Sequence, residues 1–153
     1  MIDLGTIRPG VGVGELRFGA TRDEVRQAAG EPSEVVPSEE DAGGELWIYE
    51  WAGIALGFAA EHDLRFVSCE TFNVTAAFNG ETLVGLDRES AEAALERAGA
   101  DEGAFRADDD DEGNGQIAVP RLALSLWFDE GAVESVGWSV LFDDDDNVLW
   151  PTT

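Results

Sequence analysis

The stretch RLALSLWFDEGAVESVGW, residues 121–138, decides the fold class more than any other part of this chain. Its leucines stand at alternate positions, which places them on one face of a strand and Trp127 on the opposite face. The residues Asp129-Glu130-Gly131 are typical of a turn, and a second apolar run from Val133 to Trp138 follows them. The stretch therefore predicts an antiparallel hairpin with one apolar face.

A similar pattern occurs earlier in the chain. Apolar residues alternate with small ones over 54–58, and Glu61-His62-Asp63 predicts a hairpin turn into a second strand over 64–69. Both hairpins follow an acidic, glycine-containing stretch. We therefore expect two antiparallel hairpins, one in each half of the chain.

Signals for one short helix precede each hairpin. Thr21 and Glu24 have the spacing of a capping box, and a glycine and a proline after them predict a helix over 22–29. In the second half, Asp87 is a candidate N-cap, and apolar residues at helical spacing follow it up to Gly99. Each half therefore begins with a helix.

One helix followed by several strands thus occurs twice, with Gly19 and Gly85 in matching positions. This order favours antiparallel sheet over a doubly wound parallel sheet. We predict an α+β fold of two tandem helix-plus-antiparallel-sheet repeats, residues 1–76 and 77–153, packed as one compact body.

A family resemblance supports this layout. It depends on one set of residues, Phe18-Gly19-Ala20-Thr21-Arg22, Val25, Gly30, Pro32 and Trp47-Ile48-Tyr49. The pattern resembles the superfamily that contains the SmpA/OmlA-type outer-membrane assembly lipoproteins and the tandem-repeat beta-lactamase inhibitor proteins. The resemblance implies a helical segment on a small antiparallel sheet, with two such units in the inhibitors forming one sheet surface that binds another protein. It implies this general mode of binding and no particular target.

Acidic residues dominate the composition. The chain has 33 Asp and Glu against nine basic residues, all of them arginine, and a formal net charge of −24. Such a surface could bind a basic partner, or could keep the protein hydrated in concentrated salt, and the absence of lysine also fits a GC-rich source genome. Binding of nucleic acid is the class that this charge argues against.

Other global features predict a folded cytoplasmic protein. Hydrophobic residues make up 44% of the chain, which is too many for a disordered one. We find no signal peptide and no apolar run long enough for a membrane span, so we expect no membrane association. Cys69 is the single cysteine, which rules out an intrachain disulfide and predicts a small buried side chain.

No motif predicts a metal, a cofactor or catalysis. Asp108, Asp110 and Glu112 precede a glycine as in a calcium loop, but the twelfth position is Val119 where a bidentate glutamate is needed. The glycines over 10–14 match neither dinucleotide-binding nor P-loop spacing. His62 is the only histidine and falls in a predicted turn, so we expect no catalytic residues, no metal and no cofactor.

Aromatic residues are the remaining candidates for a functional surface. Trp47, Tyr49 and Trp51 alternate along one predicted strand face, and Trp127 lies on the face opposite the leucines. On the open side of a joint sheet they would form an aromatic patch of the kind that anchors interfaces, whereas the alternative interpretation places them in the core.

Our leading hypothesis is therefore a non-enzymatic, inhibitor-like module that binds another protein, which could be basic. One alternative is an acidic immunity or antitoxin-type protein that neutralises a basic partner electrostatically. A further alternative is a hydrolase that uses surface carboxylates.

Overall fold

Two short helices are present in the computed structural model, which describes residues 2–38, 42–100, 102–107 and 114–151. Helix α1 (Arg22–Ala29) begins with a capping box, in which the Thr21 hydroxyl accepts from the Glu24 amide and the Glu24 carboxylate accepts from the Thr21 amide. Helix α2 (Arg88–Arg97) begins at Asp87, whose carboxylate accepts a hydrogen bond of 2.8 Å from the Ser90 amide. Both predicted helix starts are confirmed.

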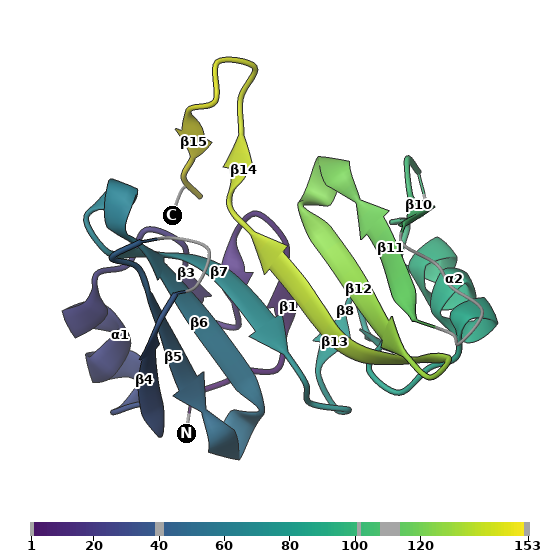
Figure 1. Cartoon of the computed structure of the whole chain (residues 1–153), viewed down its shortest axis with the longest axis horizontal. Helices are drawn as coiled ribbons and strands as arrows, with labels where there is room; N and C mark the ends of the chain where they lie inside the picture. Colours follow the sequence, from purple (N-terminus) through teal and green to yellow (C-terminus); the bar gives the residue numbers. More distant parts are fainter. Residues whose placement is uncertain (1, 39–41, 101, 108–113, 152–153) are drawn as a thin grey trace.

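An eight-stranded antiparallel sheet runs across the molecule in the order β10-β11-β12-β13-β7-β6-β5-β4 (Figure 1). Its two halves meet where β13 pairs with β7, with Trp138 opposite Cys69 and Val136 opposite Thr71. The eight strands are β4 (Glu34–Pro37), β5 (Glu45–Tyr49), β6 (Ile54–Ala59), β7 (Arg65–Thr71), β10 (Phe105–Ala107), β11 (Gly115–Val119), β12 (Leu124–Asp129) and β13 (Ala132–Ser139).

Smaller elements surround this sheet. A three-stranded sheet is formed by β1 (Ile7–Arg8), β2 (Gly12–Val13) and β3 (Leu16–Arg17), and two-stranded ribbons by β8 (Ala77–Phe78) with β9 (Glu81–Thr82) and by β14 (Leu141–Phe142) with β15 (Val148–Leu149). Three single turns of 3₁₀-helix are η1 (Glu50–Ala52), η2 (Ala60–His62) and η3 (Pro120–Leu122). The β14–β15 ribbon projects from the rest of the molecule (Figure 1).

The predicted α+β class of two helix-plus-sheet repeats is wrong. The fold is mostly β: two helices, of eight and ten residues, stand against fifteen strands in the described part of the chain. The main strands of both halves belong to one continuous sheet, which the sequence had left open. Sequence periodicity predicts single strands well, but the pairing of β7 with β13 joins residues more than 60 positions apart and has no local signature. The proposed division at 76/77 stays a prediction.

The two predicted hairpins are confirmed, with small shifts at their ends. Strands β6 and β7 are joined through η2, and Asp63 takes a left-handed conformation there. Strands β12 and β13 are joined at Glu130 and Gly131, both with positive φ. Leu122 lies in η3 and not in the strand that was expected to begin there, because the chain turns at Pro120 before β12.

One face of the large sheet is covered by the rest of the chain. Helix α1 lies over β5, where the Arg26 guanidinium is 4.6 Å from the centre of the Trp47 ring, and α2 lies over β12, where Arg88 is 4.2 Å from the centre of the Phe128 ring. Between the helices, the Trp138 indole donates a hydrogen bond of 2.8 Å to the Gly12 carbonyl of the three-stranded sheet. The core is therefore one layer between this face and its cover.

Within the described residues, no helix is long and apolar enough to cross a membrane.

Candidate functional site: the open face of the sheet

The opposite face of the eight-stranded sheet has no covering element among the described residues. Its side chains alternate with the core residues along each strand, and most are half-buried by their neighbours in the sheet. They are mainly small or polar, so few of them project far from the sheet and the face is accessible to solvent. By strand pairing, this open face comprises Leu46, Ile48, Ala55, Gly57, Ser68, Glu70, Gln116, Ala118, Ser125, Trp127, Ser135 and Gly137.

Three side chains form a line across the middle of the open face. Trp127 on β12 is directly opposite Ser135 on β13, and the Ser135 hydroxyl donates a hydrogen bond of 2.8 Å to the Glu70 carboxylate on β7. Trp127 is 42% exposed, although Leu126 and Phe128 on either side of it are buried. The line therefore crosses the junction between the two halves of the sheet and joins an exposed indole to an acidic group.

A broad hollow lies beside this line, over β4 to β7. Its volume is about 950 Å³, and small residues such as Ala55, Gly57 and Ser68 lie along it. Its described lining includes Glu45, Glu61 and Glu70 and no arginine. The Glu45 carboxylate itself turns to the covered side of the sheet, where it is 3.4 Å from the Arg22 guanidinium. This part of the open face is therefore both recessed and acidic.

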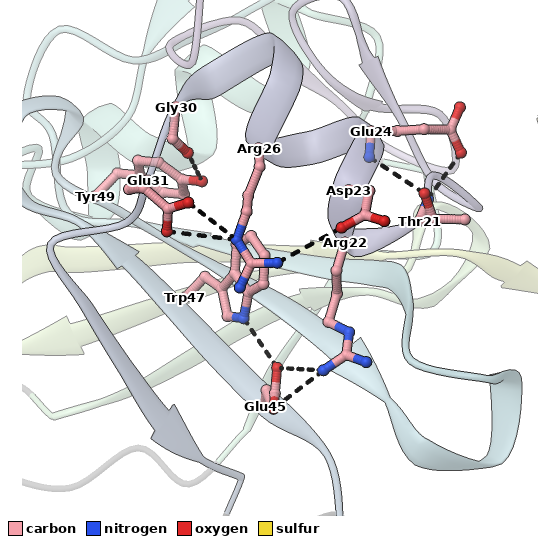
Figure 2. A network of polar contacts seen from close by, with 10 residues as sticks. All are labelled: Thr21, Arg22, Asp23, Glu24, Arg26, Gly30, Glu31, Glu45, Trp47 and Tyr49. Carbon is pink, nitrogen blue, oxygen red and sulfur yellow. Dashed lines mark hydrogen bonds and ion pairs between the residues drawn. The ribbon is translucent and has the colours of Figure 1, made fainter.

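Two of the predicted site residues, Trp47 and Tyr49, do not lie on the open face. Both are fully buried beneath α1, and Figure 2 shows the contacts that hold them there. The Arg26 guanidinium covers the Trp47 ring, and the Tyr49 hydroxyl donates a hydrogen bond of 2.9 Å to the Gly30 carbonyl. Burial raises the pKa of Tyr49 to about 12. The expectation that they form an accessible patch is wrong, because their side of the sheet is the one that α1 covers.

The other two predicted site residues are exposed, but they lie on different surfaces. Trp51 is 47% exposed in η1, beyond the end of β5, and its ring meets the Tyr49 ring edge-on with 6.4 Å between centroids. It therefore belongs to the rim of the covered side. Trp127 lies on the open face, as the alternation in β12 predicts. The structure thus does not bring the four predicted aromatic residues together.

The residues considered for other chemistry are also placed by the structure. His62 lies in η2, with its Nε2 3.6 Å from the Glu61 carboxylate, and no hydrogen bond joins it to a serine or cysteine in the part of the chain that is described. Cys69 is buried as predicted, and burial raises the pKa of its thiol. The calcium-loop candidates Asp108, Asp110 and Glu112 lie outside the described residues. Among the residues that are described, no group of three His, Cys, Asp or Glu side chains could hold a metal ion.

Glu70, Ser135 and Gly137 were not among the site residues predicted from the sequence. Alternation in the run Ser68-Cys69-Glu70-Thr71 could have placed Glu70 on the face away from the core. Ser135 and Gly137 have no comparable signal. A β-bulge between β12 and β13 shifts the register near Trp127, so counting along the strand alone gives no pairing for them.

Comparisons with known proteins add a likeness of fold. No family model and no curated protein matches the sequence. The structure is similar to the crystal structure of an extracellular protein containing a SCP domain from Bacillus anthracis str. Ames, with a TM-score of 0.50 and 12% sequence identity. The match covers 89% of this chain and 49% of the other, so this chain spans about half the length of the extracellular protein. At this identity the likeness shows the fold alone.

The net charge of −24 leads to a prediction about salt. If the acidic surface is an adaptation to concentrated salt, the melting temperature should rise by about 5 °C or more between dilute buffer and molar potassium chloride. This corresponds to a gain of about 2 kcal/mol in the free energy of unfolding. Repulsion among the carboxylates is screened over about 10 Å at 0.1 M salt and over about 3 Å at 1 M. A sucrose series of matched osmolality is the control, because sucrose favours compact states without screening charge. Equal melting temperatures in dilute buffer and molar salt would exclude the adaptation.

Proposed function

We propose that this protein is a non-enzymatic binding module and that its partner is a protein with a basic surface, which docks on the open face of the sheet. The observation that carries the proposal is the uncovered eight-stranded face with exposed Trp127 at its centre. Tryptophan is enriched at protein interfaces and among the few residues that carry most of their binding energy.

Charge complementarity supports a basic partner. The described lining of the hollow on the open face includes Glu61 and Glu70 and no arginine, whereas its third glutamate, Glu45, pairs with Arg22 on the covered side. Glu70 makes no ion pair with any described residue. The net charge of −24 adds a long-range negative field, which speeds encounters with positively charged proteins. The likeness to tandem-repeat inhibitor proteins noted in the sequence suggests the same general mode of binding. The immunity-type and hydrolase alternatives stay predictions.

Photo-crosslinking from two positions tests the proposal. A benzoylphenylalanine is placed at Ala118, which is on the open face, or at Glu96, which is exposed on α2. We expect one protein from the source organism's lysate to crosslink at 118 and not at 96. That protein is then identified, purified and titrated against the wild-type chain and a Trp127→Ala variant.

We expect the purified partner to bind Trp127→Ala at least about 30-fold more weakly than wild type, which corresponds to about 2 kcal/mol for an interface anchor. The affinity should also fall as salt is added, because the attraction is between opposite charges. The same affinity for both proteins, or crosslinking that does not depend on position, would contradict the proposal. An unfolded variant would be recognised by its lost NMR dispersion, and Trp127→Phe then replaces it.

A further inference from the structure

We infer that the group recognised at the centre of the open face is an arginine side chain of the partner, which stacks on the Trp127 indole and forms an ion pair with Glu70. This inference rests on the proposed function and specifies the chemistry of its central contact. It follows from the positions of four residues in three adjacent strands, β12, β13 and β7.

The strand register brings the indole and the carboxylate close together. Gly137 on β13 is directly opposite Glu70 on β7, while Trp127 on β12 is opposite Ser135, two positions from Gly137 on the same face. Two strand spacings of about 4.8 Å and an offset of two residues along β13, about 7 Å, separate the Trp127 and Glu70 backbones by about 12 Å, with β13 between them. A guanidinium between the two side chains can therefore reach both.

Gly137 leaves open the space between them. A Cβ built at this position would meet the Trp127 Nε1 atom and the Cys69 carbonyl oxygen, each at 3.7 Å, which is ordinary van der Waals contact. The indole thus lies over β13, and position 137 contributes no side chain between the two groups; the side chain that stands between them is the short, buried Ser135. Any larger residue at 137 would occupy the place that the inference gives to the guanidinium.

The carboxylate is oriented and available. The Ser135 hydroxyl donates to one oxygen of Glu70, Oε2, at 2.8 Å, which fixes the side chain across the strand junction. The other oxygen has no hydrogen-bond donor or ion-pair partner among the described residues, and the hollow around it contains no arginine. The negative charge of Glu70 is therefore left for a group from outside the chain.

Arginine fits this arrangement better than lysine. Its flat guanidinium can stack on an indole face and at the same time donate hydrogen bonds in its plane to a carboxylate, whereas an ammonium is a compact, strongly hydrated charge. The protein uses the same pairing on its covered side, where Arg26 lies over Trp47 and forms ion pairs with Asp23 and Glu31 (Figure 2). On the open face this chain supplies the indole and the carboxylate, and the partner supplies the arginine.

A titration with short peptides tests the inference by NMR. The probes are N-acetyl-Gly-Arg-Gly-amide, its lysine analogue and its citrulline analogue, which has the shape of arginine without the charge. The reporter is the indole N–H signal of Trp127, assigned as the one of five that is missing from a Trp127→Phe variant. We expect the arginine peptide to shift this signal with an affinity about threefold or more above that of the lysine peptide, and the citrulline peptide to leave it unchanged.

Three variants separate this contact from general attraction to an acidic protein. Glu70→Gln and Gly137→Val should each weaken the arginine titration about threefold to tenfold, because the first removes the charge and the second fills the space. Glu96→Gln, on the other side of the molecule, removes the same charge and should leave the titration unchanged. Valine at 137 suits a strand, so this variant should keep the dispersed spectrum of a folded protein. Gly137→Ala replaces it if it does not.

The outcomes distinguish this inference from the proposed function. Equal shifts with arginine and citrulline, or equal losses with Glu70→Gln and Glu96→Gln, would overturn the arginine contact even if a protein crosslinks at position 118. An absent shift with all three peptides would also overturn it. If the peptide behaves as expected and no protein crosslinks, the arginine contact stands as a property of the surface and the proposed function falls.

Discussion

Replacing Trp47 by alanine is expected to lower the free energy of unfolding by about 3–5 kcal/mol, the usual cost of removing a buried large aromatic side chain. Trp47 is completely buried and packs on Phe58, with 4.6 Å between ring centroids. Its loss would also remove the stacking surface for Arg26 and the indole hydrogen bond of 3.1 Å to Glu45 (Figure 2). Urea denaturation followed by circular dichroism measures the change.

Trp51→Ala is the matched control, since it removes the same side chain four positions away. Trp51 is 47% exposed, and among the described residues its ring meets the ring of Tyr49 edge-on, so we expect a change of about 1 kcal/mol or less. Equal losses of stability in the two variants would contradict the burial of Trp47 under α1. Trp47 would then return as a candidate for the binding surface.

Replacing Gly12 by alanine is expected to destabilise the protein by about 2–4 kcal/mol through backbone strain and a disrupted buried hydrogen bond. Gly12 has a φ of +150°, and an added Cβ would come within 1.9 Å of the Leu16 carbonyl oxygen. This contact is with backbone, so no side chain can rotate to relieve it. Opening β2 from β3 would disturb the bond of 2.8 Å from the Trp138 indole to the Gly12 carbonyl.

Gly80→Ala is the control for the Gly12 variant. Gly80 also has a positive φ, of +82°, but a Cβ there would have no atom within 4 Å. Only the conformational cost of a left-handed alanine remains, which is about 1–2 kcal/mol. The unfolding free energies of both variants come from the same denaturation experiment. A Gly12 variant as stable as the Gly80 variant would show that the three-stranded sheet is not a necessary part of the core cover.

Within the described residues, one face of the eight-stranded sheet is uncovered and the other is covered. The three-stranded sheet and both helices pack on the covered face, and most of the buried apolar residues lie between them and this face. The open face retains small side chains, one exposed tryptophan and one glutamate that a neighbouring serine orients. That combination makes the arginine titration informative, since binding and folding depend on opposite faces.

Parts of this architecture could be predicted from residues close together in the sequence. The capping residues Thr21 and Asp87 mark both helix starts, because an N-cap hydrogen bond forms within three residues. Alternation over 124–128 places Trp127 opposite the buried leucines, because successive side chains of a strand point to opposite faces. Turn residues locate both hairpins for the same local reason.

The site and the fold class depend on contacts between distant residues. Whether Trp47 or Trp127 faces solvent is decided by which face of the sheet the helices cover, and the alternating pattern is the same in both cases. The single eight-stranded sheet and the line from Trp127 through Ser135 to Glu70 exist because β13 pairs with β7. The sequence alone determined the local elements, whose hydrogen bonds close within a few residues. Only the tertiary structure decided the register between distant strands and the choice of open face, since both arise from packing the whole chain around one core.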